Sequence, residues 1–240
     1  MRFYRRCPVP GFEVGEVRII FNPQSNRGFK AAIALLEARH GKALFAPQWH
    51  TQGTPEEQAQ RAEIYELFLE KAASFVDRDF PHVKILPVWH GTSDKILHDL
   101  FETGYANLST TDVGFFGRGI YSAWEAEYAH KVYYRGALIL NWVAIYSAYP
   151  VLASDNLMGG TNYANYDAHV VPVAPVTNDP NEYDYRAVHP GQPHKYVELV
   201  TFQSMNCLPR YLVKLQPTLP REIGSVTPDS PHTAPTYVGI

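Results

Sequence analysis

The first 82 residues show more helical than extended spacing of apolar side chains. Apolar positions three or four residues apart predict helices over residues 29–40 and 54–76. The second helix opens with Thr-Pro-Glu-Glu at 54–57, where threonine caps, proline fits the first turn and the last glutamate completes a capping box. Residues 16–22 alternate as a strand does. Residues 1–15 contain two prolines and predict an irregular arm.

Beyond residue 82 the pattern changes to strands. We expect strands over residues 83–89, 137–151, 168–173, 196–202 and 210–215. Pro87 has no backbone N–H, so it favours an edge position or a bulge for the first of these strands. Short helices are expected over 94–103 and 123–134, and loops over 105–116, 154–166 and 174–194. Helices first and strands afterwards are typical of an α+β domain rather than of a repeated βαβ unit.

We predict a single domain over residues 1–215. Residues 1–82 form its N-terminal helical part, and residues 83–215 form the core that carries the candidate chemistry. Residues 216–240 are rich in proline, threonine and serine and predict a flexible tail. A chain of 240 residues, 45% apolar and 19% charged, fits one well-filled globular core.

Composition argues against several classes of protein. No apolar run reaches the roughly 18 residues of a membrane-spanning helix, so no membrane partner is expected. Two cysteines supply neither a disulfide framework nor a zinc site, which predicts a reducing compartment and no metal. A net charge of −3 disfavours a surface that coats duplex DNA. No apolar secretory segment opens the chain, so we expect an intracellular location, cytoplasmic or nuclear; a secreted effector is left open.

Trp-His-Gly-Thr-Ser at residues 89–93 stands where a strand runs into a helix. Glycine there lets a ligand approach the backbone, and the free N–H groups of a helix start bind polar atoms. The ordinary alternative is a histidine whose ring is satisfied within a turn. Taken alone, this cluster leaves both interpretations of His90 open.

The segment FGRGIYSA, residues 116–123, has two glycines one residue apart. It is not a dinucleotide-binding fingerprint, because the third glycine and the leading strand are missing. The ordinary interpretation is the bulged start of a strand. Tyr121 is its candidate functional residue.

Glu198 lies within KYVELVTF, residues 195–202, in the middle of a strand that looks buried. A buried carboxylate is costly unless a partner or a ligand uses it. Alternation places Glu198, Val200 and Phe202 on one face of the strand. The ordinary alternative is a solvated edge position.

Together these segments resemble the poly(ADP-ribose) polymerase superfamily, the diphtheria-toxin-like branch of the ADP-ribosyltransferases. That family carries a histidine in His-Gly-Ser/Thr, a tyrosine in Phe-Gly-Lys-Gly-Ile-Tyr-Phe-Ala, and a glutamate that opens a strand leading to Gln-x-x-Pro-x-Tyr-Leu-Ile. Here the three correspond to His90, Tyr121 and Glu198. YDAHVV at residues 166–171 also resembles the family's Tyr-Asp-Ser-x-Val, so the resemblance covers about residues 83–215.

The glutamate is placed by the residues that follow it. Aligning Pro-x-Tyr-Leu at 209–212 puts Asn206 in the family's glutamine position, and the family spacing of eight then leads back to Glu198. A second alignment, through Gln203, leads to Lys195 instead. The first alignment needs no gap, so Glu198 is preferred.

The resemblance implies the ADP-ribosyltransferase fold: two packed, mostly antiparallel β-sheets around an NAD+ cleft, with flanking helices. It implies a catalytic triad of His90, Tyr121 and Glu198. The NAD+-binding residues that it implies are His90, Gly91, Thr92, Gly119, Tyr121 and Tyr134. Tyr134 follows Tyr121 by thirteen residues, the spacing of several intracellular mono-transferases, whereas Val132 stands at the shorter spacing of chain-elongating members.

The implied activity is transfer of single ADP-ribose units from NAD+, a co-substrate, to a protein acceptor, with release of nicotinamide. Two alternatives stay open: a poly(ADP-ribose)-forming enzyme, and an inactive domain of the same fold that binds ADP-ribose or a partner. Ser122, Ala129 and Asn206 depart from the family pattern and keep the inactive alternative open. Only two helices and a strand are expected before residue 83, too little for a regulatory helical domain, so no DNA-dependent activation is expected.

Overall fold

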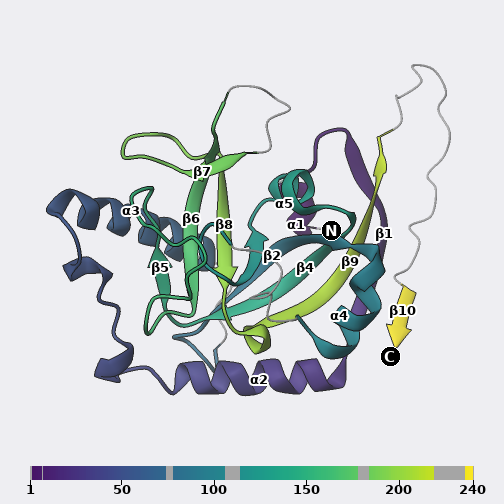
Figure 1. Ribbon diagram of the computed structural model, residues 1–240. Coiled ribbons are helices and arrows are strands. Elements are labelled where there is room, and N and C mark those ends of the chain that lie inside the picture. The colour runs from purple at the N-terminus through teal and green to yellow at the C-terminus, as the bar shows by residue number, and fades with distance from the viewer. Residues whose placement is uncertain are drawn as a thin grey trace.

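One large, mostly antiparallel sheet organises the chain (Figure 1). A computed structural model describes residues 2–6, 8–73, 78–105, 114–177, 184–218 and 236–239. The strands are β1 (Phe12–Phe21), β2 (Lys84–Ser93), β3 (Ile120–Ala123), β4 (Gly136–Ile145), β5 (Ala148–Pro150), β6 (Ala168–Pro175), β7 (Tyr185–Ala187), β8 (Tyr196–Thr201), β9 (Cys207–Pro217) and β10 (Thr236–Gly239). The α-helices are α1 (Arg2–Arg6), α2 (Pro23–Glu37), α3 (Pro55–Ala72), α4 (Leu97–Thr103) and α5 (Ala126–Tyr133), with short 3-10 turns at Ala43–Phe45, Trp49–Thr51, Asp94–Ile96 and Ser204–Asn206.

The sheet has two halves that meet at a narrow junction. Its strand order is β10-β1-β9-β4-β2-β3-β8-β6-β5, with β7 pairing with β6. β2 meets β3 only at Trp89↔Ala123, whereas β2 pairs with β4 along its whole length. The mostly antiparallel sheet, together with its helices, confirms the α+β class. The two separate sheets that we expected are instead two halves of one hydrogen-bonded sheet, because that single pair joins them.

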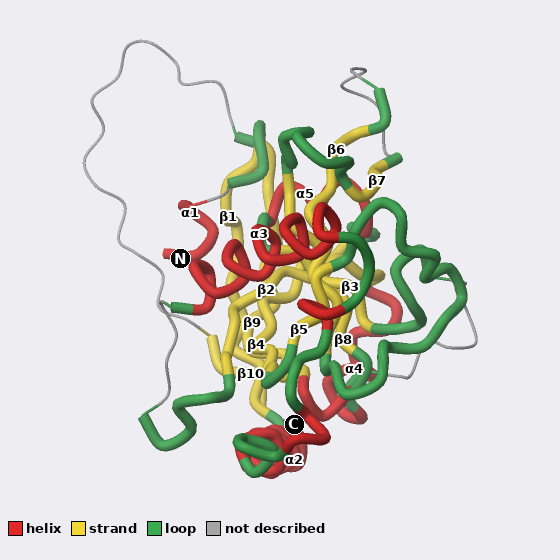
Figure 2. The backbone as a smooth tube through the Cα atoms, turned by 90° about the vertical axis from the view of Figure 1, so that its left-hand side faces the viewer, coloured by secondary structure: helices red, strands yellow, loops and turns green. Residues whose placement is uncertain are grey.

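Helices cover the sheet and fill its core. Alternate residues of β4 enter different buried clusters: Ile139 belongs to the cluster that includes Phe68 of α3, and Leu138 belongs to the cluster that includes Ala129 of α5. α2 packs against the ends of β4 and β9 through residues such as Phe29. In Figure 1, α5 lies above strands β2, β4 and β9, and α2 lies below them. Figure 2 shows α3 running across the layer in front of the strands.

The helix starts follow local capping chemistry. α3 begins as predicted, with Thr54 and Glu57 forming a reciprocal capping box. α2 begins earlier than predicted, at Pro23, because the Asn22 side chain accepts hydrogen bonds from the N–H groups of Gln24 and Ser25. The preceding strand therefore ends at Phe21.

Three predictions need correction. β2 is an interior strand, and its register with β4 runs through Pro87↔Trp142 without a shift, so the predicted bulge is wrong. Proline is tolerated because β3 meets β2 only beyond it, at Trp89. The strand predicted over 137–151 is two strands, because the backbone N–H groups of Tyr146 and Ser147 donate to the Asp167 carboxylate instead of to a ladder. The ordinary interpretation of residues 116–123 as the start of a strand is confirmed by β3, but the helix predicted from Ala123 starts only at Ala126.

Other elements were missed at the ends of the chain and in its loops. The predicted arm over 1–15 contains α1 and the start of β1, and the loop over 174–194 contains β7. The predicted flexible tail begins within β9, and β10 pairs in parallel with β1, so these parts of 216–240 are ordered strand. The remainder of the tail, and most of the loop over 105–116, lie outside the described residues.

None of the helices in the described part of the chain has the length and apolar character needed to cross a membrane.

Candidate active site

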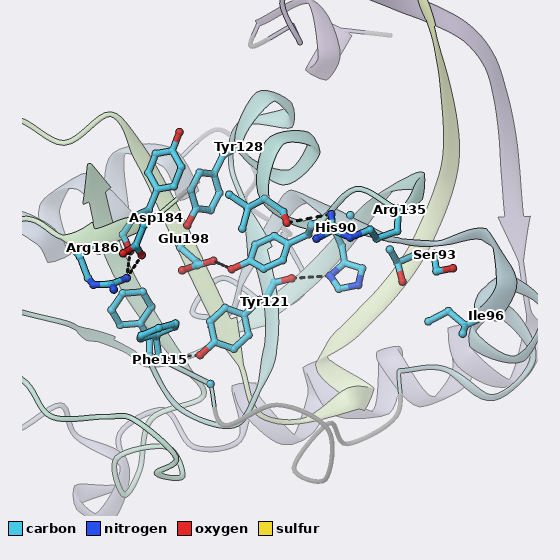
Figure 3. A pocket seen from close by; sticks show the side chains of 17 residues that line it. His90, Ser93, Ile96, Phe115, Tyr121, Tyr128, Arg135, Asp184, Arg186 and Glu198 are labelled. Atoms are coloured by element: carbon cyan, nitrogen blue, oxygen red, sulfur yellow. Dashed lines mark hydrogen bonds and ion pairs between the residues drawn. The ribbon is translucent and has the colours of Figure 1, made fainter. Parts of the chain in front are cut away.

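The junction between the two halves of the sheet carries the candidate site. β2, β3 and β8 are neighbours here, and Ala123 pairs with Trp89 on one side and with Glu198 on the other. A cavity of about 470 Å³ opens over this junction. It is lined by five of the predicted site residues, namely His90, Gly91, Thr92, Tyr121 and Glu198 (Figure 3). The folding of three distant segments into adjacent strands therefore brings these residues together.

The His90 ring is fixed by the neighbouring strand. Its Nδ1 lies 2.6 Å from the backbone oxygen of Tyr121, and a carbonyl only accepts, so Nδ1 carries the proton. Burial lowers the pKa of His90, which keeps the imidazole neutral near pH 7. Tyr105 packs edge-on against the ring, with centroids 5.1 Å apart. In this tautomer Nε2 bears a lone pair and can accept a hydrogen bond from a ligand hydroxyl.

The Glu198 side chain is buried within the sheet, at the wall of the cavity. It lies in β8 between β3 and β6, pairing with Ala123 and Val171, and its exposed fraction is only 1%. Burial raises its pKa to about 7, and hydrogen bonds from Tyr133 and Tyr128 oppose that rise. A carboxyl group with this pKa exchanges its proton near neutrality, as a residue that handles protons or developing charge requires. The solvated edge position considered from the sequence is ruled out.

Tyr121 forms one wall of the cavity and orders the adjacent turn. Its hydroxyl donates to the backbone oxygen of Gly117 at 2.7 Å and accepts from the N–H of Phe116 at 2.9 Å. Its ring lies 6.2 Å from the Tyr133 ring, with 51° between their planes. Both rings therefore line the same cavity as Glu198.

Gly91 serves packing as well as the cavity. A Cβ atom at this position would lie 2.5 Å from the backbone oxygen of Ala129 and 2.7 Å from the backbone of Tyr133. The absence of a side chain therefore lets the C-terminal half of α5 approach β2. This close approach brings Tyr133 to the cavity.

Two predicted NAD+-binding residues do not line this cavity. Gly119 packs against β8, where a Cβ atom would lie 2.6 Å from the backbone oxygen of Thr201. Tyr134 caps the C-terminus of α5, and its ring stacks on His130 with centroids 4.5 Å apart. Its neighbour Tyr133 lines the cavity instead.

Sequence reasoning missed several lining residues, and the spacing of small residues could have found one of them. Ala126, Ala129 and Tyr133 recur at i, i+3 and i+7, so they share one helix face, which turns Tyr134 away. The other missed residues include Phe115, Tyr128, Arg135, Asp184, Tyr185 and Arg186. Arg135 lies at one end of the cavity, and at the other end Arg186 is ion-paired with Asp184 (Figure 3).

No protein-family model matches the chain, and a search of curated proteins returns no match. Within the described ranges, no group of three or more histidine, cysteine, aspartate or glutamate side chains is placed to hold a metal ion.

Proposed function

We propose that this protein is an NAD+-dependent ADP-ribosyltransferase with the ADP-ribosyltransferase fold, transferring single ADP-ribose units to a protein acceptor. The observation that carries the proposal is the convergence of His90, Tyr121 and Glu198 from three strands on one cavity. They are the three residues that the resemblance in sequence singles out. Their convergence is what a shared catalytic role requires.

Nicotinamide binds between the rings of Tyr121 and Tyr133, where aromatic stacking contributes about 0.5–1.5 kcal/mol for each pair beyond the area buried. Backbone groups of Gly91 bond the carboxamide, and Thr92 assists. His90 Nε2 accepts a hydrogen bond from the adenosine ribose, because Nδ1 already donates to the Tyr121 carbonyl. These contacts hold the dinucleotide so that its scissile bond faces Glu198.

Glu198 acts on the nicotinamide ribose. Its carboxylate accepts a hydrogen bond from the 2′-hydroxyl and stabilises the positive charge that develops on C1′ as the bond to nicotinamide breaks. The interaction strengthens in the transition state, so it raises the rate and not only the affinity. Nicotinamide leaves with the bonding electron pair, the acceptor nucleophile attacks C1′, and Glu198 or water takes the acceptor's proton.

Nicotinamide release from NAD+ by purified protein tests the proposal. We expect turnover by the wild type and a 10²- to 10³-fold lower rate for Glu198→Gln, as for loss of one preorganised group. The matched control is Glu63→Gln, an exposed carboxylate on α3, which should release nicotinamide at the wild-type rate. Wild-type turnover by Glu198→Gln would remove Glu198 from the reaction.

The same preparation separates the alternatives. Binding of ADP-ribose without nicotinamide release would identify an inactive domain of this fold. Automodified protein labelled from NAD+ should run as a sharp band, and a smear would identify a poly(ADP-ribose)-forming enzyme.

A further inference from the structure

Two phenols on α5 hold the carboxylate of Glu198. The Tyr133 hydroxyl donates to Glu198 Oε1, and the Tyr128 phenol is a second neutral donor beside the same carboxyl group, where it lowers the pKa of Glu198. Tyrosine is a neutral donor, so this buried acid is held in place without an opposite charge on either phenol. Oε1, to which Tyr133 donates, is one of the two carboxyl oxygens that a ribose hydroxyl could use.

The aromatic faces are too close for the ligand that they would grip. Tyr121 and Tyr133 have ring centroids 6.2 Å apart and planes at 51°. A flat ring inserted between two others needs near-parallel faces about 7 Å apart, twice the carbon–carbon contact distance. The Tyr133 ring must therefore turn to admit nicotinamide, and that turn carries its hydroxyl away from Glu198.

Tyr128 is not free to move in the same way. It is 2% exposed, and the rings of Tyr185 and Tyr196 pack against it with centroids 4.9 and 5.2 Å away. Tyr133, by contrast, is half-buried and is the last residue of α5. The two phenols therefore differ in how tightly they are packed, although both lie beside one carboxyl group.

We infer that Tyr128 and Tyr133 are positioning residues with different tasks in the proposed transferase. Tyr133 holds Glu198 in the free protein and releases it to the ribose 2′-hydroxyl when NAD+ enters. Tyr128 stays beside the carboxyl group throughout and, as a donor, holds the carboxylate toward the reacting carbon. The inference rests on the proposed function and deepens it.

A test by pH must separate Glu198 from its neighbours. The other titratable or charged side chains lining the cavity are His90, Tyr121, Tyr128, Tyr133, Arg135, Asp184, Tyr185 and Arg186. A phenol that donates to a carboxylate favours the charged form, so its removal raises the pKa of that carboxyl group. A shift caused by deleting one hydroxyl therefore reports on Glu198, because His90 makes its Nδ1 contact with the Tyr121 carbonyl instead.

The experiment compares Tyr133→Phe and Tyr128→Phe with Tyr134→Phe, a matched control outside the cavity. The pH profile of kcat/KM reports the free enzyme, and that of kcat reports the complex. Tyr133→Phe should move the acid limb of kcat/KM up by about one pH unit and leave that of kcat in place, with a KM a few-fold lower. Tyr128→Phe should move both limbs upward and reduce kcat about tenfold. Tyr134→Phe should match the wild type.

Equal profiles for all three variants would overturn the inference, as would a kcat limb that moves with Tyr133→Phe. The absence of nicotinamide release by the wild type would instead overturn the proposed function. In that case the contact between Tyr133 and Glu198 is tested by measuring the free energy of unfolding in urea between pH 5 and 8. Tyr133→Phe should lose stability more steeply with rising pH than the wild type, and equal slopes would refute the contact itself.

Discussion

Asp155 and Glu198 are two carboxylates withdrawn from solvent, and their partners differ in charge. The Asp155 side chain is 8% exposed and receives two hydrogen bonds of 2.8 Å from the Arg61 guanidinium. Arg61 also donates to the Pro150 backbone oxygen and lies over the Tyr149 ring. Glu198, in contrast, is 1% exposed, accepts a hydrogen bond from the neutral phenol of Tyr133 and has the neutral phenol of Tyr128 beside it.

This difference separates a structural acid from a candidate catalytic one. A bidentate arginine neutralises Asp155, and the pair ties α3 to the loop after β5. The phenols leave the charge of Glu198 uncompensated, and burial raises its pKa to about 7. A fold retains such a costly group where a ligand completes it. The cavity in front of Glu198 provides the place for that ligand.

The largest expected effect is on stability, from Arg61→Met. This change leaves the Asp155 carboxylate buried without its cation, which typically costs about 3–5 kcal/mol of unfolding free energy. Urea denaturation followed by tryptophan fluorescence measures the loss. Arg18→Met, which breaks an exposed pair with Glu16, is the control and should unfold as the wild type does. Similar midpoints for both variants would show that Arg61 does not stabilise the fold.

The next largest effect is a gain in stability relative to the wild type, expected for Glu198→Gln, and it depends on pH. Glu198 binds its proton more tightly in the folded chain than in the unfolded chain, so the wild type loses stability as pH rises from about 4.5 to about 7. Glu198→Gln has no proton to lose there. Its stability relative to the wild type should therefore rise across this window by an amount on the order of 3 kcal/mol. Parallel pH curves for the two proteins would contradict the buried, uncompensated state of Glu198.

The sequence predicted the acid but not its surroundings. Glu198 is predicted by counting back from Pro209-x-Tyr211-Leu212 with the spacing of the family that the sequence resembles. The two phenols could not be found in this way. They depend on how closely α5 approaches β2, and that distance is set by Gly91 against Ala129, a contact between segments far apart in sequence.

The fold, like the site, was predictable from the sequence only in part. Long periodic segments such as α3 and β8 were correct in kind, and the capping box fixed the start of α3. The errors fall where a tertiary partner overrides local pattern. Tyr146 and Ser147 look like strand, but Asp167 takes their N–H groups and ends β4. Ala123 was predicted to begin a helix, but it pairs with Glu198 of β8 and so belongs to β3. Four residues are too few for the sequence to reveal this pairing.

Asp167 is an intermediate case that sharpens the comparison, and its partner gives the smallest expected effect. Its Oδ1 lies 2.5 Å from Arg39 Nη1, while Oδ2 accepts from the N–H groups of Tyr146 and Ser147. Arg39 is 30% exposed, so water can replace part of what it supplies. Arg39→Met should therefore cost only about 1–2 kcal/mol, less than Arg61→Met.

The stability loss caused by Arg39→Met should grow as the pH rises. Burial raises the pKa of Asp167, and Arg39 opposes that rise, so loss of Arg39 raises the pKa further. Ionising the Asp167 carboxyl group then costs more free energy in the folded variant than in the folded wild type. The variant's loss of stability should therefore be greater at pH 8 than at pH 5. Urea unfolding at both values measures the difference. An equal loss at the two pH values would mean that Arg39 acts through packing against Phe45, over which its guanidinium lies 4.8 Å from the ring centre, and not through its charge.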